Sequence, residues 1–77
     1  MSRIRLFWDF FGPSATRTAE HFRKHLDGFL LANSVTDCET GTSSSGPGHE
    51  AAYCVAPLET SEGLQRALRP RRSEPEP

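Results

Sequence analysis

Apolar and polar side chains alternate along residues 3–11, RIRLFWDFF. One side of this segment is apolar throughout and consists of Ile4, Leu6, Trp8 and Phe10. The other side mixes charges with aromatic rings and consists of Arg3, Arg5, Phe7, Asp9 and Phe11. A period of two with this aromatic content predicts a β-strand, which the Gly12-Pro13 pair ends.

A different period follows the break. The next apolar residues step by three and four along the chain, as Ala15, Ala19, Phe22, Leu26, Phe29 and Leu30. That spacing places them on one stripe of a helix. Ser14 is a suitable N-cap, and Asn33 is a suitable end because asparagine tolerates the left-handed conformation.

The second half predicts two strands, a short helix and a tail. Residues 35–42 and 49–56 are predicted as strands, joined by the loop SSSGPG at residues 43–48. A short helix follows, capped by Thr60 or Ser61 and ended by Pro70. Residues 70–77 are charged, rich in proline and almost free of apolar side chains, which predicts a disordered tail.

The predicted order is strand, helix, strand, strand, helix, within one α+β domain over residues 1–69. A right-handed crossover and the hairpin after it place the third strand between the first two. The result is a three-stranded antiparallel sheet in the order 1-3-2, with two helices on one face. This order resembles the ferredoxin-like split β-α-β without its last strand (βαββα). The resemblance covers about residues 3–69 and rests on element order, which many unrelated functions share.

In this arrangement one face of the sheet has no covering layer. We expect the helices to cover the more apolar side of residues 3–11, so that Phe7, Asp9, Phe11 and Tyr53 lie on the uncovered face. Such a face suggests a homodimer or a ligand surface, and an open edge at residues 3–11 would also favour pairing with another chain. Two alternatives are that loops or the tail cover this face, or that the faces are reversed.

His21 and His25 stand four residues apart on the predicted helix, the spacing that many metal sites use. A zinc site needs a third and usually a fourth ligand, and the chain contains neither a CxxC nor an HExxH motif. His49 begins the last predicted strand, and Asp9, Glu20 and Glu50 offer oxygen atoms. The sequence favours a solvated helix flank, with no metal and no cofactor.

Cys38 and Cys54 would be direct cross-strand neighbours in a hairpin that turns around Gly46. Two small buried thiols are the favoured interpretation over a redox pair. The register stays open because the predicted loop is long.

Composition narrows the functional classes. The chain has 77 residues, nine basic and ten acidic side chains and a net charge of −1. A nucleic-acid binder normally carries a basic excess, so nucleic acid is not an expected partner. No apolar run approaches the ~20 residues that cross a bilayer, and we identify no signal-peptide pattern. A cytoplasmic location with reduced thiols and no membrane partner is the expectation.

No motif of nucleophilic catalysis or phosphate binding appears, which leaves catalytic activity undecided. We expect a non-enzymatic binding or interaction module that acts as a homodimer through Phe7, Asp9, Phe11 and Tyr53, with an unknown small ligand as a further partner. The alternative is a small ferredoxin-like enzyme, or a ligand- or metal-binding protein, that uses His21, His25 and His49.

Overall fold

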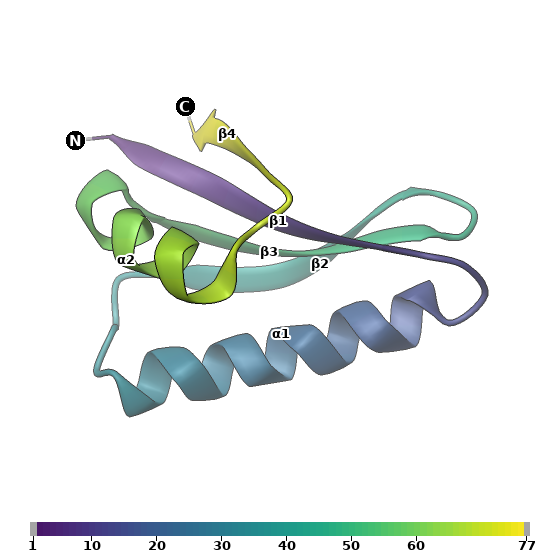
Figure 1. Ribbon diagram of the computed structural model, residues 1–77, viewed down its shortest axis with the longest axis horizontal. Coiled ribbons are helices and arrows are strands. Elements are labelled where there is room, and N and C mark those ends of the chain that lie inside the picture. Colours follow the sequence, from purple (N-terminus) through teal and green to yellow (C-terminus); the bar gives the residue numbers. More distant parts are fainter. Residues whose placement is uncertain (1, 77) are drawn as a thin grey trace.

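The structure is a computed structural model that describes residues 2–76 (Figure 1). Its elements are β1 (Arg3–Phe11), α1 (Ala15–Ala32), β2 (Glu39–Gly46), β3 (His49–Pro57), α2 (Leu58–Leu68) and β4 (Arg72–Glu76). The four strands form one antiparallel sheet in the order β2-β3-β1-β4. Neither helix of the described part is long and apolar enough to cross a membrane.

Both helices pack on the same face of the sheet. Leu6 and Trp8 of β1 share one apolar core with Leu26 of α1 and Leu64 of α2. The long helix α1 runs along the sheet (Figure 1). The core strand β3 contributes small side chains, Ala52, Cys54 and Ala56, so the helices can approach its backbone closely. The predicted helix-facing side of β1 is therefore confirmed.

The ends of α1 are fixed by local hydrogen bonds. Gly12 turns the chain out of β1 with φ +103°, a conformation that favours glycine, and its N–H donates to the Gly48 carbonyl at 2.8 Å. At the other end, the Asn33 side-chain amide donates to the Phe29 carbonyl at 2.8 Å. The left-handed residue after α1 is Ser34, with φ +57°, and not Asn33 as predicted.

The sheet has four strands, and the prediction of three was wrong. Arg72–Glu76 pairs antiparallel with β1 as β4, within the segment predicted as a disordered tail; Pro77 lies outside the described residues. Backbone pairing and an ion pair between Arg5 and Glu76 at 3.0 Å hold this strand, neither of which needs apolar side chains. β1 is consequently an inner strand, and the open edge predicted there does not exist. The outer strands are β2 and β4.

The β2–β3 hairpin is shifted from its predicted register. β2 begins at Glu39 and runs through most of the predicted loop, so that the turn falls at Pro47–Gly48. Cys54 therefore pairs with Thr40 and not with Cys38. The segment ETGTSSSG has no apolar alternation to mark it as a strand, because an outer strand can be held by main-chain pairing to its neighbour alone.

Candidate functional site

The sheet face opposite the helices carries a group of aromatic and charged side chains from three strands. Phe7 of β1 lies opposite Tyr53 of β3 and Arg72 of β4, and Phe11 lies opposite His49 of β3. We call this face the open face. The open-face cluster is Phe7, Asp9, Phe11, His49, Tyr53 and Arg72. All four residues predicted for a binding surface belong to it.

Asp9 is the centre of the cluster. Its carboxylate accepts hydrogen bonds from Arg72 Nε and Nη2 at 3.0 and 3.1 Å, and from His49 Nε2 at 3.0 Å. The side chain is only 9% exposed. The Arg72 guanidinium lowers the pKa of Asp9 below its ordinary value, and His49 acts in the same direction, although burial opposes both. Asp9 is therefore a carboxylate at neutral pH.

Phe7 is covered by its own chain. The guanidinium carbon of Arg72 lies 3.9 Å from the centre of the Phe7 ring, and the Tyr53 ring lies 6.5 Å away from it. As a result Phe7 is only 6% exposed. Aromatic contact with a partner on this face falls to Phe11 and Tyr53.

Phe11 is the most accessible ring of the cluster, at 67% exposed. It stacks on the His49 imidazole with ring centres 4.4 Å apart and an interplanar angle of 19°. At the other side of the cluster, Arg5 lies over the Tyr53 ring at 4.9 Å. Gly41 of β2 leaves room for Tyr53, because a β-carbon at Gly41 would lie 2.5 Å from the phenol oxygen.

The three histidines do not form one site. His21 and His25 contact each other on α1, whereas His49 is bound to Asp9 on the open face. Within residues 2–76, no group of three or more His, Cys, Asp or Glu side chains is arranged to hold a metal ion. A single centre built from His21, His25 and His49 is therefore not assembled by this fold.

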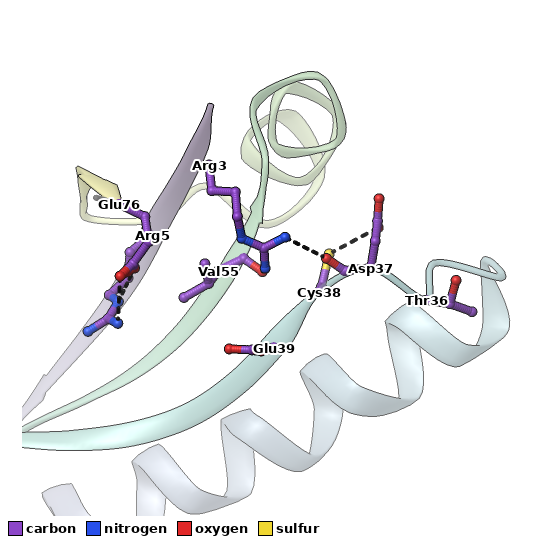
Figure 2. Close-up of a pocket in the computed structure, with 8 residues that line it drawn as sticks. All are labelled: Arg3, Arg5, Thr36, Asp37, Cys38, Glu39, Val55 and Glu76. Atoms are coloured by element: carbon purple, nitrogen blue, oxygen red, sulfur yellow. Dashed lines mark hydrogen bonds and ion pairs between the residues drawn. The ribbon is translucent and has the colours of Figure 1, made fainter. Parts of the chain in front are cut away.

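A separate hollow of about 410 Å³ lies at the end of the sheet where β1 begins (Figure 2). Its lining consists of Arg3, Arg5, Thr36, Asp37, Cys38, Glu39, Val55 and Glu76. Arg5 is bound by Glu76 through two hydrogen bonds of 3.0 and 3.2 Å, and Arg3 donates to the Asp37 carbonyl at 3.4 Å. Burial raises the pKa of the Cys38 thiol, which therefore stays neutral. Charges of both signs line this hollow, so it has no clear preference for an anion or a cation.

Sequence reasoning missed Arg72 and the role of His49. A sequence signal for Arg72 exists, since Arg72, Glu74 and Glu76 alternate with a period of two in RSEPE. The two ends of that pattern complement the charges of Asp9 and Arg5 on β1. The alternating charges of residues 72–76 could therefore have indicated a fourth strand that pairs with the charged side of β1.

Comparison with known proteins gives no match: no family model fits the chain, and no curated protein or solved structure matches it. Its class therefore comes from the fold: residues 2–76 form a two-layer α+β domain, with both helices on one face of the sheet and no helix on the other.

Proposed function

We propose that the protein is a non-enzymatic binding module that acts as a homodimer through the open face of its sheet. The observation that carries the proposal is the absence of helical cover from this face, where Phe11 remains 67% exposed within the described chain. A domain of 77 residues buries a modest fraction of its surface, so a second copy on this face would add apolar burial.

The charges on the open face also suit a second copy. Arg72 is paired with Asp9 and Arg5 with Glu76 inside the same chain. A partner therefore does not need to supply a strong charge of either sign, and an identical face of mixed charge meets that condition. With a net charge of −1 the chain offers no basic excess to a nucleic acid.

We extend the proposal to the fold family and the location. The order β1-α1-β2-β3-α2-β4, with β1 between β3 and β4, is consistent with a ferredoxin-like domain that includes its last strand. Cys38 and Cys54 are both free thiols, which suits the reducing cytoplasm.

Sedimentation of the wild-type protein and two variants at tens of micromolar tests the homodimer. Phe11→Asp places a charge at the most exposed ring of the open face and should shift the protein toward monomer. Leu31→Asp is the matched control, because Leu31 is 82% exposed but lies on α1. Phe7 is less suitable, since a charge at a side chain that is 6% exposed would also destabilise the fold. A wild-type monomer, or equal dissociation by both variants, would contradict the proposal.

A further inference from the structure

Two imidazoles meet on the exposed surface of α1. His21 and His25 lie one turn apart, and their Nε2 atoms are 2.9 Å from each other. The ring centres are 4.6 Å apart, with an interplanar angle of 42°. At this distance the Nε2–H of one ring donates a hydrogen bond to the Nε2 lone pair of the other. The lone-pair positions of both rings thus converge on one small region beside the helix.

The separation of the two nitrogens matches a chelate. Bonds from imidazole nitrogen to zinc and similar ions are about 2.0–2.1 Å long. Two such bonds at a right angle place the nitrogens about 2.9 Å apart, and at a tetrahedral angle about 3.3 Å apart. The observed 2.9 Å therefore corresponds to the right-angle arrangement, which square-planar Cu(II) and Ni(II) adopt.

We propose that His21 and His25 form a two-imidazole site for a divalent late transition ion, with Cu(II) bound most tightly. Metal binding replaces the hydrogen bond between the rings by two metal–Nε2 bonds. The proton of the donor Nε2 passes through solvent to Nδ1 of the same ring, so both imidazoles bind the ion in their neutral form. The sequence-based expectation of no metal rested on the missing third protein ligand. Water can complete the coordination of an ion held by two imidazoles, so the third protein ligand is not required.

No group of three or more His, Cys, Asp or Glu side chains forms around the pair within residues 2–76, so an ion bound there would keep open coordination positions. On one side the histidines border an apolar hollow of about 400 Å³ that also contains Phe10, Phe22 and Leu68. On the other side Lys24 lines a second hollow next to both rings, and its positive charge opposes a cation. The open positions of a bound ion would be left to water or to a small added ligand. This proposal does not depend on the homodimer.

The chain contains its own reporter for this site. Trp8 is the single tryptophan, and its ring centre lies 5.1 Å from that of Phe22. Phe22 lines the same hollow as His21 and His25. Because Cu(II) quenches tryptophan fluorescence at short range, binding at the histidine pair should reduce the emission of Trp8.

The experiment titrates the purified, metal-free protein with copper(II), nickel(II) and zinc(II) chloride in a buffer that does not bind metals. Wild type should take up one Cu(II) per chain with quenching of Trp8, and the electron paramagnetic resonance spectrum should show nitrogen coupling. Nickel and zinc should bind more weakly, following the usual affinity order. His25→Asn should weaken copper binding at least tenfold.

A composition-matched variant separates the chelate from simple histidine content. Arg23→His combined with His25→Arg keeps three histidines but sets two of them two residues apart on α1, where side chains do not face each other. It should bind copper as weakly as His25→Asn. All the changed residues are exposed, and circular dichroism checks that the variants stay folded. Equal copper affinity in wild type and this variant, or no binding near one ion per chain, would overturn the proposal.

Discussion

The guanidinium of Arg72 lies over the ring of Phe7, its central carbon 3.9 Å from the ring centre. The same group donates two hydrogen bonds to Asp9. One side chain of β4 therefore covers an apolar ring and neutralises a carboxylate on the neighbouring strand. Each side chain of β4 is at least partly exposed, and two of them bind side chains of β1: Arg72 through this contact and Glu76 through its ion pair with Arg5.

Substitutions of Arg72 test whether the planar guanidinium, with its two hydrogen bonds to Asp9, contributes to the stability of the fold. Arg72→Ala should lower the free energy of unfolding by about 1–2 kcal/mol, at the lower end for charged hydrogen bonds because Arg72 is partly exposed to solvent. Arg72→Lys keeps the charge but cannot form the planar two-bond contact, so it should recover only part of this loss. Urea denaturation measures both. Full recovery by lysine would show that charge alone matters.

The lowered pKa of Asp9 should make the free energy of unfolding decrease at acidic pH. Its pKa in the folded protein is lowered by Arg72, whereas the unfolded chain returns it to the ordinary value of about 3.9. The stabilisation is therefore fully present above that value and is lost as the pH falls through the lower, folded pKa. Urea denaturation of wild type at a series of pH values below about 5 should show this loss. Asp9→Asn should be less stable at neutral pH and should decline less steeply in acid; curves that stay parallel would contradict the assignment.

The two thiols should react in a fixed order. Cys54 is fully buried, and burial raises its pKa to about 12; burial also raises the pKa of Cys38, which is partly exposed. Because the thiolate is the reactive form, a chromogenic disulfide reagent at mildly alkaline pH should modify Cys38 slowly and Cys54 only after unfolding. Cys38→Ser should abolish the first phase alone. Rapid reaction of both thiols in the native protein would show that the β2–β3 region opens readily.

Substitutions of a buried and an exposed leucine on α1 measure how much the packing of this helix on the sheet contributes to stability. Leu26 is 1% exposed and lies in the shared core, so Leu26→Ala should cost about 2–5 kcal/mol of unfolding free energy. Leu31→Ala changes an exposed position and should stay within about 0.5 kcal/mol of wild type. Chemical denaturation compares the two. Similar values would mean that α1 does not pack as the structure shows.

Strong periodicity made β1 and α1 predictable. The alternation of RIRLFWDFF and the stripe from Ala15 to Leu30 give the observed elements, because one side of each segment must be buried. The position of Phe7 and Phe11 on the face away from the helices followed from the alternation in β1. That of Tyr53 followed from the small residues Ala52, Cys54 and Ala56 on the opposite side of β3. The sequence did not predict that Arg72 covers Phe7, because residues 70–77, which contain Arg72, were predicted to be a disordered tail.

The two outer strands were predicted poorly for a common physical reason: a strand was predicted at residues 35–42 where β2 is Glu39–Gly46, and β4 was not predicted. β2 is ETGTSSSG and β4 is RSEPE, and neither contains a large apolar side chain. Each pairs through its backbone with one inner neighbour, so its side chains have little need to be apolar. Because β4 was not predicted, β1 was wrongly expected to be an edge strand. Because β2 was placed too early in the chain, Cys38 was wrongly expected to pair with Cys54.

The pairing of β1 with β4 places Arg3 directly opposite Glu76. The two ends of the described chain therefore leave the sheet side by side, near enough for a short flexible linker to join them. Reopening the chain between α1 and β2, in the coil around Thr36, would create a circular permutant that starts at β2 and ends with α1. That permutant would retain all three strand pairings in the same register, so the same fold could form with its chain ends between α1 and β2.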